Sequence, residues 1–448
     1  MRKGSIPIQG GTVAVVGGSI AGCAAALAAH RAGADRITVY ERAAGELADR
    51  GVGLAVHNAR YAELSAAGYM DAAMPWVQLT TRRWYTREGA APLGRLVGVQ
   101  PFPFRSYCWG PLWRELRGRL PATTDFRTGV TVGKVTGSAD GATVHLGNAD
   151  EGDPGRFGTA HSDPGRFATD HSDPGRFDTD HRDTEHFDLV IGADGYRSIV
   201  RNAAFPDVRP SYAGYLAWRG AVPAERLAEL DLPGLPSNPW AEEDLVYGVF
   251  PGGHVVIYRI PDGRGGHRAN WILYTTPPTG LDLRLDTPTS LPPGTLTGPL
   301  HAHLAYVTSE LLPPYWGGLI RLTPPQEVFI QPMYDFAAPS YTAGRLLLAG
   351  DAASVARPHT GAGAVKALQD AAALETALCA VPERPDALDG YGTDRGASGR
   401  TMAELGRRLG RFFVQETPDW RTLDQAGLDS AWAAADGSGA FGGREMKV

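Results

Sequence analysis

The sequence lacks the features of several protein classes. Its three cysteines, Cys23, Cys108 and Cys379, lie far apart and form no CxxC pair, which argues against a disulfide framework and a zinc site. Only four of its 448 residues are lysines, and the formal net charge of −6 at pH 7 provides no basic field for nucleic-acid phosphates. A Gly-X-Y period, a heptad repeat and, after residue 29, an apolar run of the ~18 residues that span a membrane are also missing. We therefore expect a cytoplasmic globular protein with no metal and with neither nucleic-acid nor membrane partners.

The N-terminal segment allows two interpretations. Basic residues precede the apolar run 12–29, in which residues 20–23 (Ile-Ala-Gly-Cys) resemble the cleavage site of a bacterial lipoprotein. The same residues fit a buried strand at 12–16, a Gly-Gly-Ser turn and a helix at 21–32, followed by a second strand at 37–40. The second interpretation is favoured, because the turn interrupts the run and the next strand follows at the spacing of a βαβ unit.

A decapeptide repeat interrupts the middle of the chain. The sequence Asp-Pro-Gly-Arg-Phe begins at Asp153, Asp163 and Asp173, and a decaying fourth copy begins at Asp183. A period of ten is too short for a helical solenoid, and Asp-Pro-Gly is typical of turns. Histidines recur in step with the repeat, but they have no recognisable metal-ligand spacing. We expect residues 152–186 to be an exposed insertion within a hairpin.

Glycine is abundant, with 57 residues, and the first of three glycine clusters suggests a nucleotide site. Residues 17–22 (Gly-Gly-Ser-Ile-Ala-Gly) turn a strand into a helix whose free N–H groups and dipole can receive a pyrophosphate. Glu41 ends the next strand, where a carboxylate can bind a ribose hydroxyl. This cluster alone does not distinguish NAD from FAD, and a glycine turn in another α/β fold would look similar.

The second and third clusters each follow a further buried strand. Residues 188–195 bring the pair Asp194 and Gly195 to a tight turn. Residues 344–353 bring Asp351 to a strand end, where it can bind a hydroxyl chain. The loop 361–363 then opens a helix, expected at 363–380, whose dipole can stabilise negative charge near its N-terminus.

In this order, the three clusters resemble the fingerprints of the FAD-dependent aromatic hydroxylases, the group A flavoprotein monooxygenases. The resemblance covers about residues 12–415 apart from the repeat, and segments 212–220 and 357–367 look most like the 2,6-dihydroxypyridine 3-hydroxylase branch. It implies an α/β fold of the PHBH type, in which a Rossmann-like FAD/NAD(P)-binding domain carries an antiparallel β-sheet substrate domain.

The resemblance and the aromatic-rich strands expected between residues 212 and 275 divide the chain into interleaved parts. The expected FAD-binding domain consists of 1–75, of 106–205 with the repeat insertion 152–186, and of 336–415 with C-terminal helices; the expected substrate domain consists of 76–105 and 206–335; 416–448 is the expected tail. We expect a helix at 397–414, and we expect the Gly/Ser-rich end after Asp436 to fray.

The resemblance also implies which residues bind the cofactor. The first cluster would face the FAD pyrophosphate, Glu41 the adenosine ribose, and the third cluster the flavin. The full set is Gly17, Ser19, Ile20, Ala21, Gly22, Glu41, Arg42, Arg50, Val52, Gly53, Leu54, Arg114, Val132, Asp194, Gly195, Asp351, Pro358, Gly361, Ala362, Gly363 and Ala364. Trp113, Ser354 and Val365 stand where the family usually has arginine, histidine and asparagine, and Arg114 is the candidate to replace the first.

The implied reaction is hydroxylation of an electron-rich, hydroxylated aromatic or heteroaromatic ring, a hydroxypyridine first of all. NAD(P)H reduces FAD, O₂ forms a flavin C4a-hydroperoxide, and one oxygen atom passes to the ring. The side chains expected to contact the substrate or assist its deprotonation are His57, Tyr215, Arg219, Tyr247 and His359, although a buried aromatic residue is often only part of a core. We also expect a homo-oligomer.

Other functions account for less of the sequence. An NAD-dependent dehydrogenase would explain only the first glycine cluster. A flavin halogenase should carry a Trp-x-Trp-x-Ile-Pro segment, which is absent. A flavoprotein of the same fold with another reaction, such as epoxidation or Baeyer–Villiger oxidation, and a non-catalytic flavin-binding protein are the alternatives that the sequence leaves open.

Overall fold

The computed structural model describes residues 8–45, 47, 53–147, 184–230, 232–236, 239–281, 283, 291, 293–294, 296–437 and 439–443. The decapeptide copies, Arg50 and Val52 lie outside these residues. The two segments that flank the repeat, β8 (Ala142–Leu146) and β9 (Thr184–Phe187), pair antiparallel, which confirms that the insertion joins the strands of a hairpin.

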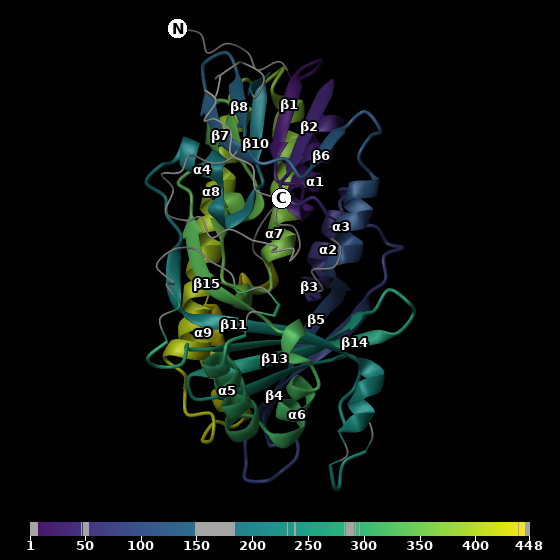
Figure 1. Cartoon of the computed structure of the whole chain (residues 1–448), viewed down its shortest axis with the longest axis vertical. Coiled ribbons are helices and arrows are strands. Elements are labelled where there is room, and N and C mark those ends of the chain that lie inside the picture. Colours follow the sequence, from purple (N-terminus) through teal and green to yellow (C-terminus); the bar gives the residue numbers. More distant parts are fainter. Residues whose placement is uncertain are drawn as a thin grey trace, which may run out of the picture.

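A six-stranded sheet forms the upper part of the molecule in Figure 1. Its order is β16-β17-β10-β1-β2-β6, and four of its five pairings are parallel. The strands are β1 (Thr12–Val16), β2 (Arg36–Glu41), β6 (Asp125–Thr128), β10 (Leu189–Gly192), β16 (Thr342–Ala343) and β17 (Leu346–Leu348). The central strands β1, β10 and β17 are short apolar runs, as expected of parallel strands covered on both faces.

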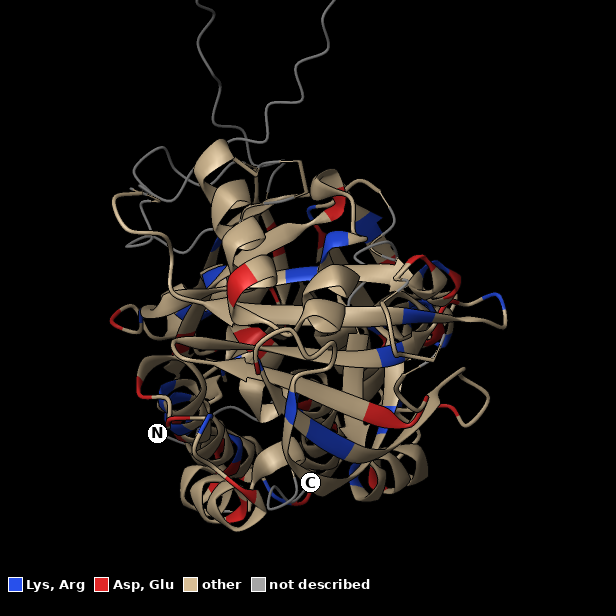
Figure 2. Ribbon diagram, turned by 90° about the horizontal axis from the view of Figure 1, so that it is seen from below, with Lys and Arg blue, Asp and Glu red and all other residues tan. Residues whose placement is uncertain are grey.

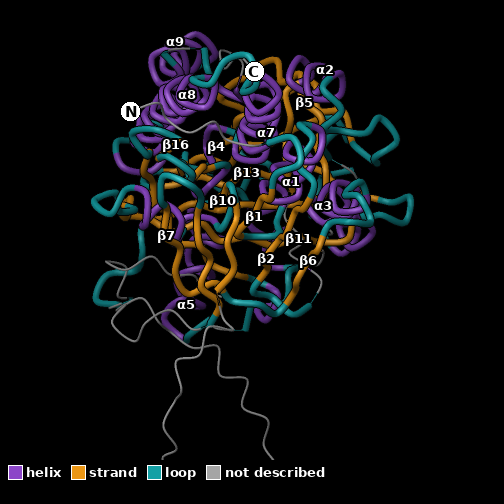
Figure 3. Tube along the Cα trace, turned by 90° about the horizontal axis from the view of Figure 1, so that it is seen from above, coloured by secondary structure: helices purple, strands orange, loops and turns teal. Residues whose placement is uncertain are grey.

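Helix α1 (Ile20–Arg31) leaves the glycine turn after β1 and packs against α3 (Trp109–Gly118) and α7 (Gly363–Ala380) (Figure 3). Its first ten residues are buried, and the side chain of Cys23 is fully enclosed. The strand–turn–helix interpretation of this segment is therefore confirmed, and residues 20–23 form the buried first turn of the helix. The small sheet β7-β8-β9, which includes β7 (Val132–Gly137), lies beside α4 (Ile199–Ala204).

A nine-stranded sheet forms the lower part of the molecule, in the order β18-β15-β11-β14-β13-β12-β4-β5-β3. Its strands are β3 (Gly53–His57), β4 (Val77–Thr86), β5 (Arg95–Cys108), β11 (Ser211–Pro223), β12 (Asp244–Phe250), β13 (Gly253–Pro261), β14 (His267–Thr275), β15 (Phe329–Ala337) and β18 (Ser354–Val355). All pairings are antiparallel except that between β4 and β12. This mixture of a parallel and an antiparallel sheet confirms the expected fold class.

Successive side chains of these strands point to opposite faces of the large sheet. One face packs against α5 (Gly298–Tyr306) and α6 (Pro314–Arg321) through residues such as Trp218 and Trp271. The other face turns toward α8 (Ala387–Gly410), α9 (Gln425–Asp436) and the parallel sheet. This second face carries the polar side chains that line the candidate site.

Two expectations about the C-terminal region are wrong. Helix α8 begins at Ala387 rather than near residue 397, because the glycines that weaken a helical sequence pattern are needed for close packing. A Cβ atom on Gly392 would lie 2.1 Å from Thr342 Oγ1, and one on Gly399 would lie 2.4 Å from Tyr341 Oη. The part of the stretch after Asp436 that the structure describes does not fray either, since the side chain of Phe441 is buried against Phe104 and Trp432. Residues 444–448 lie outside the described residues.

Acidic and basic residues are interspersed around the nine-stranded sheet when the molecule is seen from below (Figure 2). Among the helices that the structure describes, none is long and apolar enough to cross a membrane. In the same residues, no three histidine, cysteine or acidic side chains gather in a group that could hold a metal ion.

Candidate active site

The turn after β1 requires glycine at two positions. Gly17 has a φ of +99°, and a Cβ atom on it would lie 2.4 Å from the carbonyl oxygen of Ala193. A Cβ atom on Gly22 would lie 1.8 Å from the carbonyl oxygen of Gly17. The two glycines therefore let α1 start directly above β1 and β10, so that the N-terminus of the helix faces the space between the two sheets.

The start of α1 offers a binding surface for an anion. Ser19 has extended backbone geometry and makes no side-chain capping bond, so the first N–H groups of the helix have no intrahelical acceptor. Ser19, Ile20 and Ala21 all line a cavity. Glu41 is buried at the end of β2, where its carboxylate accepts hydrogen bonds from Gly18 N and from Ala43 N, both over 2.9 Å.

The third glycine cluster is held by a buried ion network. Asp370 on α7 accepts hydrogen bonds from Gly350 N over 2.9 Å and from Lys366 Nζ over 2.8 Å. Lys366 Nζ also donates to Gly350 O over 2.9 Å, and Arg395 forms an ion pair of 2.7 Å with the other oxygen of Asp370. Lys366 and Asp370 are both buried, and they hold the Gly350 peptide next to Asp351, which lines the cavity.

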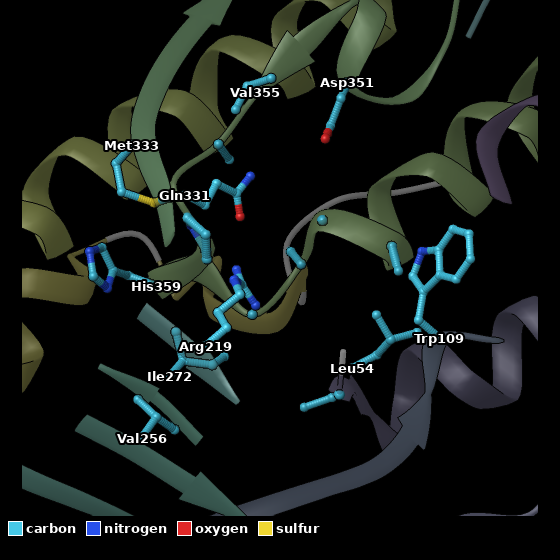
Figure 4. Close-up of a pocket in the computed structure, with 18 of the residues that line it drawn as sticks. Leu54, Trp109, Arg219, Val256, Ile272, Gln331, Met333, Asp351, Val355 and His359 are labelled. Carbon is cyan, nitrogen blue, oxygen red and sulfur yellow. The ribbon is translucent and has the colours of Figure 1, made fainter. Parts of the chain in front are cut away.

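The cavity has a volume of about 410 Å³ and lies between the parallel sheet and the large sheet. In Figure 4, Asp351, Trp109 and Leu54 lie on one side, and His359, Met333, Val256 and Ile272 on the other. Arg219 and Gln331 lie between the two groups. The cavity thus joins a side that carries Asp351 of the third glycine cluster to a side to which the strands β13, β14 and β15 contribute.

The register of the large sheet explains the composition of the second side. Ile272 pairs with Arg219 across one strand boundary and with Val256 across the next, so the three side chains share a face. Tyr274 pairs with His254 in the same way, and Val256 pairs with Tyr247. Counting in steps of two from Arg219 and Tyr247 therefore identifies the sheet residues of the cavity.

The residues present fit FAD. The free start of α1, which lines the cavity, suits a pyrophosphate, and Asp351 suits the hydroxyl groups of a ribityl chain. Glu41 does not line the cavity, because its carboxylate binds the backbone of the turn itself. The loop 361–363 lines the cavity at the N-terminus of α7, where a helix dipole favours negative charge.

Comparison with known proteins points the same way. Residues 312–405 match the family model described as FAD binding domain. The chain is 27% identical to 2,6-dihydroxypyridine 3-monooxygenase of Paenarthrobacter nicotinovorans over 381 aligned residues, and this alignment covers 81% of each chain. It is 32% identical to 3-amino-4-hydroxybenzoate 2-monooxygenase of Streptomyces cremeus over 53% of each chain. The solved structure of 2,6-dihydroxypyridine-3-hydroxylase from Arthrobacter nicotinovorans superposes with a TM-score of 0.71 at 23% identity, covering 93% of this chain and 97% of that one.

The chain belongs to the FAD-dependent aromatic hydroxylases. As a member of that family it is an FAD-dependent monooxygenase with a Rossmann-like FAD domain. The family assignment and the FAD cofactor expected from the three glycine clusters are confirmed.

Most residues expected at the cofactor of this hydroxylase line the cavity. They are Ser19, Ile20, Ala21, Gly53, Leu54, Gly195, Asp351, Pro358, Gly361, Ala362, Gly363 and Ala364. Others lie behind its wall. Asp194 accepts a hydrogen bond from Ile199 N over 2.8 Å, and Val132 is buried at the start of β7. Arg42 and Arg114 are exposed, and it is Trp113, not Arg114, that contacts the glycine turn.

Three of the five expected substrate residues, Arg219, Tyr247 and His359, line the cavity. Tyr215 lies behind it, and its hydroxyl is 2.8 Å from Nε2 of His359. His57 does not reach the cavity lining, because it caps α2 (Asn58–Ala66), where its Nδ1 accepts a hydrogen bond from Ala59 N over 3.2 Å.

Sequence analysis missed several polar and aromatic residues of the cavity. His254, Tyr258 and Tyr274 follow from the two-residue alternation of β13 and β14 and were identifiable once Tyr247 was chosen. Gln331 and Phe441 had no comparable signal in the sequence.

His254, His359 and Arg219 are buried in the wall of the cavity, and the two histidine rings are neutral. Burial lowers the pKa of His254 to about 3, although a hydrogen bond to the backbone of Phe413 opposes this effect. Burial, followed by the nearby His254, Arg357 and Arg219, lowers the pKa of His359 well below its usual value. Arg219 is only 9% exposed, and its Nε has no hydrogen-bond partner among the described residues. A buried guanidinium in such a place is suited to an anionic oxygen.

Proposed function

We propose that this monooxygenase hydroxylates an electron-rich, hydroxylated aromatic ring, with a hydroxypyridine as the leading substrate class, using NAD(P)H and O₂. The observation that carries the proposal is the position of the buried Arg219 between the glycine-rich side of the cavity and a sheet face that carries histidine, tyrosine and glutamine side chains. The two relatives, a dihydroxypyridine and an aminohydroxybenzoate monooxygenase, support a small ring that carries ionisable oxygen as the substrate.

Different residues of the chain would bind the cofactor and the substrate. The N–H groups at the start of α1 bind the pyrophosphate, Asp351 binds ribityl hydroxyls, and the loop 361–363 positions the flavin ring. Bound FAD supplies the redox chemistry, for which NAD(P)H provides two electrons and O₂ the inserted oxygen atom.

On the substrate side, Arg219 binds the ionised ring oxygen and holds the ring in its electron-rich form. Gln331 provides a further polar contact for the ring substituents. Val256, Ile272 and Met333 enclose the ring and exclude water, which protects the oxygen transfer from side reactions.

The test is a panel of hydroxypyridines and phenols offered to the FAD-loaded protein, with NAD(P)H consumption and product mass recorded together. We expect a hydroxypyridine to accelerate NAD(P)H oxidation and to gain one oxygen atom in an equal amount. The Arg219→Gln variant should bind FAD yet lose most of this acceleration. FAD-loaded protein that no aromatic compound accelerates, or that yields no oxygenated product, would show the proposal to be wrong.

A further inference from the structure

A charged network stands behind His359. Asp335 on β15 is buried and pairs with Arg357 Nε over 2.8 Å and with Arg407 Nη2 over 2.6 Å. Two guanidinium groups on one carboxylate leave an excess positive charge at this place. Since Arg357 is itself buried, this charge acts on the groups beside it with little screening by solvent.

The next group in the chain of contacts is Tyr215. Burial raises the pKa of Tyr215, and the charge of Arg357 opposes this effect only in part, so the phenol keeps its proton. The guanidinium carbon of Arg357 lies 5.5 Å from the centre of the tyrosine ring. The positive charge of Arg357 favours the orientation in which the lone pairs of the phenol oxygen face the guanidinium and the O–H group points away from it. The single phenol proton is therefore left for another partner.

That partner is His359, whose Nε2 lies 2.8 Å from the Tyr215 hydroxyl. The low pKa of His359 leaves its ring neutral, with one N–H group. If Nε2 accepts the phenol proton, this N–H is at Nδ1. Among the described residues, Nδ1 of His359 has no hydrogen-bond partner although it is buried, and the residue lines the cavity. A ligand oxygen in the cavity would satisfy it.

We propose that Arg357 and Tyr215 fix His359 as a neutral Nδ1–H donor, which binds an oxygen anion of the substrate instead of removing its proton. This inference rests on the proposed function and sharpens it, because two donors, His359 and Arg219, then face the substrate oxygens. The substrate is accordingly a hydroxylated ring acidic enough to bind as its anion, and its hydroxyl proton passes to water before binding. Tyr215 and Arg357 are positioning residues that act through His359.

The first experiment observes the tautomer directly. FAD-loaded protein labelled with ¹⁵N-histidine is studied by NMR between ~pH 5 and 9, a range that brackets the usual histidine pKa. The signal of His359 is identified by its loss in His359→Gln. We expect the Nδ1–H tautomer throughout, a change towards Nε2–H in Tyr215→Phe, and no change in Tyr274→Phe, whose ring also contacts His359. An Nε2–H signal or a protonated ring in the wild type would overturn the proposal.

The second experiment measures binding of hydroxypyridines and phenols of graded acidity through the flavin absorbance. The charged and titratable groups around His359 are Tyr215, Arg219, His254, Tyr274 and Arg357. None of them is expected to set the pH dependence, so affinity should fall below the pKa of each ligand, with a midpoint that moves from ligand to ligand. We expect His359→Leu to weaken binding about 10-fold or more and His359→Gln, which keeps an N–H donor, to restore part of it.

The outcomes separate the two proposals. A midpoint that stays the same for all ligands would identify a titrating protein group and overturn only the donor role of His359. Failure of the whole series to bind would overturn the proposed function itself.

Discussion

The indole Nε1 of Trp113 donates a hydrogen bond of 2.8 Å to the carbonyl oxygen of Gly18, in the turn between β1 and α1. Trp113 is 8% exposed and stands where the family usually has an arginine. An arginine at this place would reach toward the cofactor, whereas the indole holds the backbone of the turn. In this chain the turn is therefore supported from α3 by a tryptophan side chain.

Trp113→Phe should weaken FAD binding. The substitution keeps an aromatic ring but removes the donor, and a hydrogen bond of this kind contributes about 0.5–1.5 kcal/mol. We expect the Kd for FAD to rise about 2- to 10-fold in a flavin fluorescence titration of the apoprotein. Trp76→Phe is the matched control, because Trp76 is 38% exposed and lies outside the cavity lining. An unchanged Kd in Trp113→Phe would contradict a supporting role for this bond.

Much of the site could be predicted because it depends on local sequence. The turn at 17–22 requires glycine for its backbone geometry, and the alternation of β13 and β14 places side chains on a known face. Neither the glycine turn nor the strand alternation predicts that Phe441 lines the cavity, because its position depends on how residues far apart along the chain pack together. The start of α8 was also unpredictable, since its glycines serve contacts with Tyr341 and Thr342 that the sequence does not reveal.

Phe441→Ala should uncouple NAD(P)H oxidation from hydroxylation. Phe441 comes from the C-terminal end, lines the cavity and packs on Phe104 with ring centres 5.7 Å apart. Its loss opens the cavity to water, which competes with oxygen transfer. We expect the ratio of hydroxylated product to NAD(P)H consumed to fall several-fold, with FAD affinity retained. Phe441→Leu, which keeps most of the volume, should stay close to the wild-type ratio; equal coupling in all three proteins would argue against this role.

Lys366→Met should destabilise the fold. Lys366 is 2% exposed and forms a 2.8 Å ion pair with the fully buried Asp370. Its removal leaves Asp370 with Arg395 as the remaining counterion and leaves Gly350 O without its donor, which costs about 1–3 kcal/mol. We expect a loss of this size in chemical denaturation of the apoprotein, together with weaker FAD binding, because Lys366 Nζ also holds Gly350 O beside Asp351.

The same substitution at an exposed position provides the control. Lys134 is exposed on β7, so Lys134→Met should change the free energy of unfolding by no more than about 0.5 kcal/mol. Equal effects of the two substitutions would show that the buried network does not support the third glycine cluster.

His254 should make the fold less stable as the pH falls from 7 to 5. Because its pKa in the folded protein is about 3, against a usual 6.5, the unfolded chain takes up a proton in this range and the folded chain does not. His254→Phe removes this proton uptake and keeps a ring against Tyr274 and Phe413, which stack on His254 with centres 4.8 and 4.2 Å away. The unfolding free energy of the variant relative to wild type should therefore increase by about 2 kcal/mol between pH 7 and pH 5, measured by chemical denaturation. His301→Phe, a substitution at an exposed position, should show the same change of unfolding free energy with pH as the wild type. If His254→Phe also showed the wild-type change, His254 would take up its proton in the folded protein as well.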